Sequence, residues 1–302
     1  ATGIVKPAMI VQVLTVVLNT ILAPILIAGW GPGPALGVLG AGLASSISIT
    51  IGVALLTLYF FKLEKYVSFK PALWRPRFDI WRKMLDIGLP AGGEMLLLFV
   101  YFSAVYWLIQ DFGAPAQAGF SIGGRIMQSI FMPTMAIAFA VGPIIGQNFG
   151  AGKFDRVRET FQSGIILSSV VMFITTVIMQ WRPEVLVMIF TDDAEVIEVG
   201  AIFLQLISLN FVAQGIVFTC SGVFQGLGNT RPALFSSGVR ILIFIPIALY
   251  VRYQPDFSIN MVWYISILSV TAQAIVSFLL VRREFVRKLD SSEHPGETKR
   301  AV

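Results

Sequence analysis

Charged and metal-binding residues are scarce in this sequence. Of its 302 residues only 13% are charged while 56% are hydrophobic, and there is one cysteine and one histidine. So little polar surface cannot coat a water-soluble globule of this size. The single cysteine, Cys220, excludes an intrachain disulfide framework, and one cysteine with one histidine provides no zinc ligand set. We therefore expect no metal and no redox cofactor.

Long apolar runs occupy most of the chain, each of about 20 residues and able to cross roughly 30 Å of hydrocarbon as a helix. Backbone groups in lipid are satisfied only in helices or closed barrels, and the alternating pattern of barrel strands is not seen. The sequence thus predicts an all-α membrane protein with about eight transmembrane helices. Their expected positions are 5–29, 36–61, 84–110, 115–147, 159–181, 196–225, 231–252 and 259–282.

The basic residues alternate from one predicted loop to the next. Eighteen of the 22 lysines and arginines fall at the chain ends and in every second loop, while Arg182 and Arg252 lie on the other side. Short loops rich in Lys and Arg stay in the cytoplasm. We expect a multi-pass protein of the inner (plasma) membrane with both ends of this chain cytoplasmic. The net charge of +5 is then a topology signal, and no nucleic-acid partner is expected.

A weak internal repeat indicates the domain organisation. Residues 3–8 (GIVKPA) and 228–233 (GNTRPA) each open an apolar span, with an offset of 225 residues. If the repeated unit has six helices, residues 84–285 form a complete C-terminal bundle and residues 1–62 are the last two helices of the bundle before it. Residues 63–83 are then a basic cytoplasmic linker and 286–302 a polar cytoplasmic tail. About four helices would be missing upstream, and the start at Ala1 is typical of a truncated chain. Parallel repeats around a central cavity are a recurring plan of transporters.

Two glycine-rich segments resemble the cytoplasmic loop motifs of the multidrug and toxic compound extrusion (MATE) family. These are residues 146–153 (GQNFGAGK) and 225–230 (QGLGNT), and residues 88–90 (GLP) and 132–133 (MP) fit the same pattern. The resemblance covers essentially the whole chain, as the last eight helices of a twelve-helix fold, and is closest to the DinF-like branch. It implies a transporter rather than an enzyme, one that exports organic, often cationic, compounds in exchange for H+ or Na+ by alternating access. Its partners are then a small organic molecule and the lipid bilayer.

The segment at residues 150–153 (GAGK) does not predict nucleotide binding. A phosphate-binding loop needs glycine where this chain has Gln147 and a hydroxyl where it has Phe154.

Three ionisable residues stand out well inside predicted spans, where charge is costly and by default marks function. Glu94 and Arg240 lie at similar depths. Glu94 is therefore either a proton or cation site, with Tyr101 on the same helix face, or half of a salt bridge to Arg240 that only fixes packing. Arg125 either extends to the outer surface or faces the cavity.

The resemblance also bears on the coupling ion. The sodium-dependent branch of the family has carboxylates at the positions of Leu98 and Gln214, and neither is charged here. This favours H+ over Na+, coupled through a carboxylate upstream of this chain.

The remaining candidates for a substrate cavity are polar or adaptable residues within the spans, which suit variable organic cations. They are Tyr101, Tyr106, Gln128, Met132, Asn210 and Gln214. Each is equally compatible with plain packing or an interfacial position.

Three other functions compete with drug export. A flippase of lipid-linked precursors in the same superfamily needs a basic cavity, for which Arg125 and Arg240 are the only support. A membrane-embedded enzyme needs a cluster of catalytic or metal-binding groups that these spans lack. A channel is disfavoured because no filter-like loop or charged ring is seen.

Overall fold

The computed structural model describes residues 6–30, 35–62 and 77–290, which are almost entirely helical with no strand among them. The chain divides into two compact units, unit 1 (Ala1–Arg77) and unit 2 (Phe78–Val302). The assignment of these units to two repeated six-helix bundles stays a prediction.

Unit 1 is a helical hairpin of α1 (Lys6–Ala28) and α2 (Val38–Lys62), close to the predicted spans. Small residues of α2 let its backbone approach α1, since a Cβ on Gly40 would collide with the Leu26 carbonyl oxygen. The amide of Asn19 donates to Ser45 Oγ across the pair (3.1 Å).

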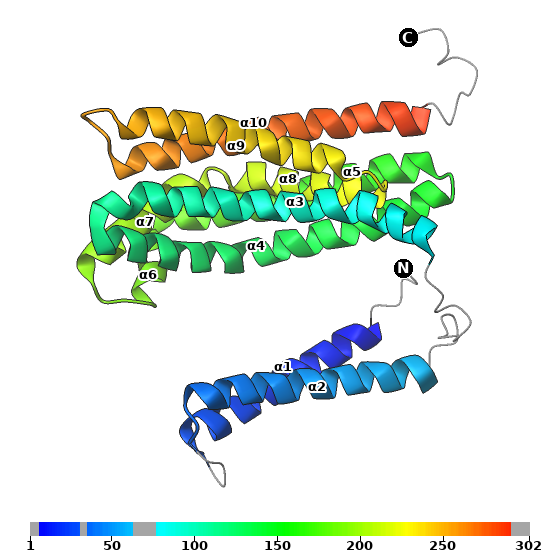
Figure 1. Ribbon diagram of the computed structural model, residues 1–302, viewed down its shortest axis with the longest axis horizontal. Helices are drawn as coiled ribbons and strands as arrows, with labels where there is room; N and C mark the ends of the chain where they lie inside the picture. Colours follow the sequence, from blue (N-terminus) through cyan, green and yellow to red (C-terminus); the bar gives the residue numbers. More distant parts are fainter. Residues whose placement is uncertain (1–5, 31–34, 63–76, 291–302) are drawn as a thin grey trace. The chain divides into compact units, whose positions relative to one another are not determined.

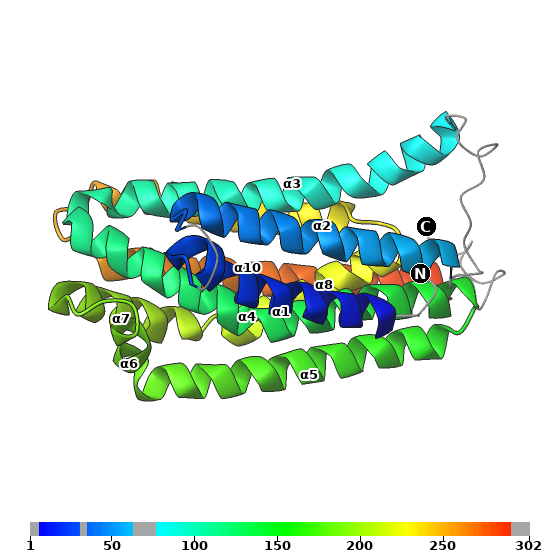
Figure 2. The same ribbon diagram turned by 90° about the horizontal axis from the view of Figure 1, so that it is seen from below.

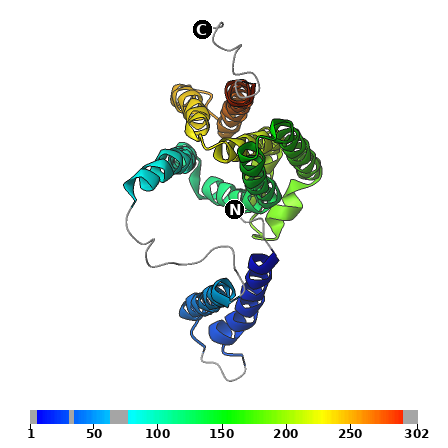
Figure 3. The ribbon, with the colours of Figure 1, turned by 90° about the vertical axis from the view of Figure 1, so that its right-hand side faces the viewer.

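Unit 2 contains the other helices (Figure 1). They are α3 (Phe78–Ile109), α4 (Gly113–Gly150), α5 (Phe154–Trp181), the short α6 (Pro183–Met188), α7 (Ala194–Ser208), α8 (Phe211–Gly226), α9 (Arg231–Arg252) and α10 (Ile259–Phe285), with a 3-10 turn at Gln110–Phe112 and a π-helical turn at Val286–Asp290. Helix α8 contacts α4, α5, α9 and α10. Figures 2 and 3 show α3 (cyan) and α5 (green) on opposite sides of this unit.

The number of membrane spans agrees with the prediction. In the described residues six stretches are long and apolar enough to cross a membrane, and the bent pair α7 and α8 adds a seventh. One of the six, Phe78–Gly150, holds both α3 and α4, and Figures 1 and 2 show the chain reversing between them. Counted as two, they bring the described spans to eight.

The helix predicted over 196–225 spans as expected but is broken, because α7 and α8 meet at an angle of 58°. The break at Leu209 and Asn210 contains neither glycine nor proline, so no residue there predicts a turn. Side chains of α5 compensate the interrupted backbone: Gln180 Nε2 donates to the carbonyl of Gln205 (2.7 Å) and Thr176 Oγ1 to that of Ser208 (2.9 Å). Irregular backbone at membrane depth is tolerated where protein supplies such partners.

Two predicted boundaries also need correction. Residues 78–83 of the predicted linker 63–83 are the first turns of α3, because interfacial charged residues such as Asp79 are compatible with helix beyond the apolar run; residues 63–76 lie outside the described residues. In the predicted polar tail 286–302, residues 286–290 continue α10 as the π-helical turn, and Leu289 is fully buried. The rest of the tail, 291–302, again lies outside the described part.

Backbone-to-backbone contact joins α4 to α8. Gly142 and Gly146 on α4 face Gly222 and Gly226 on α8, each pair spaced by four residues. A Cβ on Gly222 would lie 2.5 Å from the carbonyl oxygen of Ala138. In lipid, where apolar side chains gain little by leaving the solvent, such small-residue contacts drive helix association.

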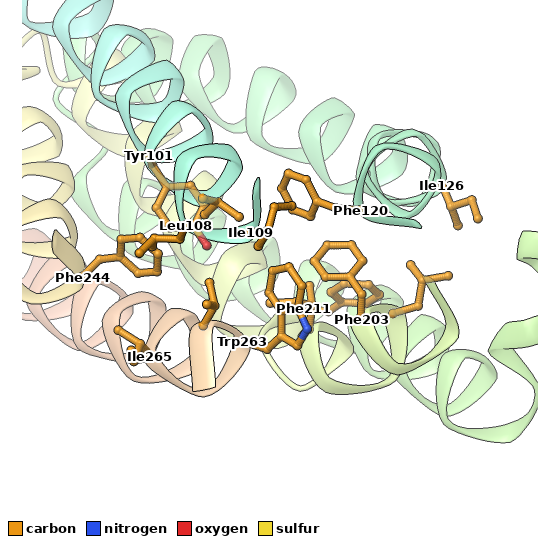
Figure 4. Packing of buried hydrophobic residues seen from close by; sticks show 14 of the residues in the cluster. Tyr101, Leu108, Ile109, Phe120, Ile126, Phe203, Phe211, Phe244, Trp263 and Ile265 are labelled. Atoms are coloured by element: carbon orange, nitrogen blue, oxygen red, sulfur yellow. The ribbon is translucent and has the colours of Figure 1, made fainter. Parts of the chain in front are cut away.

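An aromatic core fills the other end of the unit (Figure 4). The Phe120 ring of α4 stacks on Trp263 of α10 with 5.6 Å between centroids, and Phe203 of α7 meets the same indole edge-on at 4.7 Å. This cluster packs α4, α7 and α10 together.

The last turns of α10 fasten the end of unit 2 that carries the α8–α9 turn. The buried carboxylate of Glu284 accepts from Asn229 Nδ2 (3.0 Å) and pairs with Arg287 (2.9 Å). Lys288 Nζ donates to the carbonyl of Leu227 (2.8 Å). These contacts tie the QGLGNT segment to the end of α10.

We expect Gly222→Ala to lower the thermal stability of the purified protein, because the new methyl meets a backbone oxygen that cannot move cheaply. Overpacking of this kind costs about 1–3 kcal/mol. Gly238→Ala in α9 is the matched control, since nothing lies within 4 Å of its Cβ position, and it should leave the melting temperature unchanged or slightly raised. Equal melting temperatures for the two variants would contradict the proposed packing of α4 and α8.

Candidate functional site

Glu94 is the carboxylate predicted inside a span, and it lies half-buried on α3. Ser221 Oγ of α8 donates to its Oε2 (2.9 Å), and Gln225 Nε2, one turn further along α8, lies 3.4 Å from the same hydroxyl. A short chain of polar groups thus runs from the exposed Gln225 to the carboxylate.

Arg240 is buried on α9 and lies against α3. Its guanidinium carbon is 3.8 Å from the centre of the Tyr101 ring, and its Nε is buried without a hydrogen-bond partner. Two contacts fix the Tyr101 ring. Its phenol oxygen lies 2.6 Å from Ser266 Oγ of α10, and its ring meets that of Phe244 edge-on with 4.8 Å between the centroids (Figure 4). A desolvated cation–π contact is worth about 2 kcal/mol, whereas burying a charge costs several.

The salt bridge considered between Glu94 and Arg240 is not formed; neither residue has an ion pair with any residue in the described ranges. Glu94 takes a hydroxyl partner instead. Arg240 extends toward Tyr101, seven residues and about 10 Å further along α3 than Glu94. Similar depth therefore does not bring the two charges together.

A second polar contact lies between α9 and α10, one helical turn from Arg240. Gln273 Nε2 donates to Ser237 Oγ (3.0 Å), and its amide oxygen is buried without a donor. We call Glu94, Tyr101, Ser221, Arg240, Ser266 and Gln273 the polar layer.

The three candidates on α4 do not join the polar layer. Arg125, Gln128 and Met132 are all exposed on unit 2 and are spaced by three and four residues, so they share one helix face. An arginine and a glutamine on one exposed face are unsuited to contact with lipid tails. This face is therefore suited to a polar environment.

The other candidates are scattered. Tyr106 is exposed, with its ring edge-on to Phe120 (4.8 Å). Asn210 is buried at the break between α7 and α8, with an Oδ1 that has no donor, and Gln214 is half-buried one turn later. The break thus holds an unsatisfied acceptor, as the polar layer does at Gln273.

Sequence reasoning missed Ser221, Ser266 and Gln273 as members of the layer. Single hydroxyls and amides in apolar spans are common, and no pattern singled these out. The spacing of Ser221 and Gln225, one turn apart on one face of α8, was the only available signal.

A groove of about 570 Å³ also lies between α4 and α5, lined largely by small and apolar side chains with Glu159 and Thr160 among them. No residue of the polar layer lines it. Among the described residues no group of three His, Cys, Asp or Glu side chains is placed to hold a metal ion.

Known proteins resemble this chain in sequence. The family model MatE matches residues 90–250. The probable multidrug resistance protein NorM of Thermotoga maritima is 31% identical over 242 residues, which are 79% of this chain and 51% of that protein. The multidrug export protein MepA of Staphylococcus aureus is 27% identical over 247 residues, 82% of this chain and 54% of that protein. The chain thus spans about half the length of these curated relatives.

Solved structures agree on the fold. A MATE crystal structure in the bent conformation superposes with a TM-score of 0.85 at 20% identity, covering 96% of this chain and 64% of that one. A MOP superfamily transporter from Pyrococcus furiosus, described as having a binding pocket of reverse polarity that suggests a different function, gives 0.82 at 22% identity, covering 91% and 62%. The DinF-like branch stays a prediction. The chain is a multi-pass membrane protein and belongs to the MATE family, whose members are transporters and not enzymes.

Proposed function

We propose that the complete gene product exports small organic compounds across the inner (plasma) membrane in exchange for inward H+, by alternating access. The relatives NorM and MepA, which bear multidrug resistance and export in their names, support the export of drugs. The polar layer, whose members lie on α3, α8, α9 and α10, supports a transport site in this half of the protein.

The observation that carries the proposal is the environment of Glu94. Its hydrogen-bond partner is one hydroxyl, that of Ser221, and no cation neutralises it within the described part of the chain. A carboxylate at membrane depth is costly when charged. Proton uptake removes that cost without breaking an ion pair, so Glu94 is suited to gain and lose a proton during a transport cycle.

H+ is favoured over Na+ because the two positions where the resemblance implies carboxylates in the sodium-dependent branch are uncharged here. Leu98, one turn along α3 from Glu94, is apolar, and Gln214 on α8 is neutral. Hard cations are bound by several oxygen atoms at once, whereas a proton needs only one carboxylate. In this proposal Glu94 carries protons in addition to the upstream carboxylate that the resemblance implies.

A flippase of lipid-linked precursors is the second candidate. It is favoured by one feature, the arginines Arg125 and Arg240 within spans, because phosphate groups bind well to guanidinium. Drug export is preferred because both curated relatives are named for it.

We expect Glu94→Gln in the complete protein to reduce ethidium efflux from cells at least tenfold, because the amide cannot carry the proton. Ser221→Ala should reduce efflux less, since it removes only the partner. Glu159→Gln, an exposed carboxylate of α5 outside the polar layer, is the matched control and should retain wild-type efflux. An uncoupler should abolish wild-type efflux, and omission of Na+ should not. Full efflux by Glu94→Gln would show that Glu94 has no role in coupling. Dependence of wild-type efflux on Na+ alone would exclude exchange for H+.

Orientation can be tested by labelling introduced cysteines, since Cys220 is fully buried and should stay unreactive. Arg156, in the first turn of α5, and Asp192, between α6 and α7, are both exposed. We expect a membrane-impermeant maleimide added to whole cells to label Asp192→Cys and to leave Arg156→Cys unlabelled until the cells are broken. The reverse pattern would show that the proposed orientation is inverted.

A further inference from the structure

The guanidinium of Arg240 is the one buried cation of unit 2 for which the described residues provide no anion. Its relative exposure is 9%. The guanidinium makes no hydrogen bond or ion pair with a described residue. Its Nε is fully buried, whereas its two terminal nitrogens keep some exposed surface. Two of its donor groups are therefore both unused and accessible.

Unit 2 contains a second arginine in the same setting, which serves as an internal comparison. Arg252, at the C-terminal end of α9, also lies with its guanidinium carbon 3.8 Å from the centre of an aromatic ring, that of Trp107 on α3. Arg252 has in addition a carboxylate, since its Nη2 lies 2.6 Å from Asp111 Oδ2. Helices α3 and α9 thus build the same cation–aromatic stack twice, and the 3-10 turn after α3 supplies an anion, Asp111, at only one of the two.

The ring beneath Arg240 is held in place before any ligand arrives. The phenol of Tyr101 is engaged by Ser266, and Phe244 abuts the ring edge. A planar guanidinium laid on a fixed ring presents its remaining N–H groups in a set direction, which suits the two oxygens of a carboxylate, phosphate or sulfonate. Glu94 does not compete for this position, because its carboxylate is bonded to Ser221.

We propose that Arg240, oriented by Tyr101, is a subsite for the anionic group of an organic compound. The inference rests on the proposed function only in taking that compound to be exported cargo. The inference adds a substrate class to the proposed function. This class is amphipathic molecules with a carboxylate, phosphate or sulfonate, in addition to the organic cations usual for such exporters.

The test compares two xanthene dyes of one skeleton and opposite charge, anionic fluorescein and a cationic rhodamine ester. Their binding to the complete protein in phosphatidylcholine nanodiscs is measured by fluorescence polarisation. We expect Arg240→Gln to weaken fluorescein binding at least tenfold, about 1.4 kcal/mol, and to change rhodamine binding less than about twofold. Arg240→Lys should lie between, because it keeps the charge and loses the fork.

Arg252→Gln is the matched control, because Asp111 already occupies that guanidinium, and it should leave fluorescein binding unchanged. Tyr101→Leu should weaken fluorescein binding, since the guanidinium loses its support. Adding phosphatidylglycerol separates the sources of the anion: competition with fluorescein in the wild type but not in Arg240→Gln identifies a lipid headgroup, and no competition identifies a free organic anion.

Two results would overturn the proposal: a wild-type protein that binds rhodamine and not fluorescein, or an Arg240→Gln variant that loses both dyes equally together with its thermal stability. The latter would mean that Arg240 only holds α9 against α3. Ethidium efflux from cells is measured separately, so loss of the anion subsite is distinguishable from failure of the export function.

Discussion

The close contact of α4 with α8 is the constraint on which the rest of unit 2 depends. Helix α8 is short, and it touches α4, α5, α9 and α10. Its glycines allow it to lie backbone to backbone against α4, with Gly222 facing the carbonyl of Ala138. Since lipid provides little hydrophobic drive between helices, this fit determines where α8 lies. The position of Ser221, and through it the surroundings of Glu94, follow from that fit.

The charges of unit 2 fall into two kinds. The pairs with a buried or half-buried member lie near helix ends: Arg252 with Asp111 beyond the end of α3, and Glu284 with Arg287 at the end of α10. Within the spans Glu94 has a hydroxyl and Arg240 an aromatic ring. Paired charges stabilise a fold at modest net gain, whereas unpaired charges at membrane depth are a cost that a merely structural role would not require. This division supports an architectural role for the pairs at the helix ends and the proposed transport role for the polar layer.

The sequence predicted the helical membrane fold, the family and the position of nearly every span, because apolar runs and Gly or Pro turns report on these directly. It failed at the break between α7 and α8, where Leu209 and Asn210 carry no turn signal and Gln180 of α5 supplies the compensation. The sequence also left open whether Glu94 and Arg240 form a salt bridge. Depth along a helix does not reveal in which direction a long side chain extends. Ser221 and Ser266 became visible only once tertiary contacts were known.

The proposed transport site places the face of α3 that bears Glu94 and Tyr101 along the path of the transported compound. Leu98 shares this face and Leu96 lies on the opposite one, so Leu98→Cys and Leu96→Cys form a matched pair against the buried Cys220. The rate of maleimide alkylation of each cysteine is measured in everted vesicles of the complete protein, with and without a transported dye. We expect the dye to slow alkylation at position 98 and to leave the rate at position 96 unchanged. Equal rates at position 98 with and without dye would contradict it.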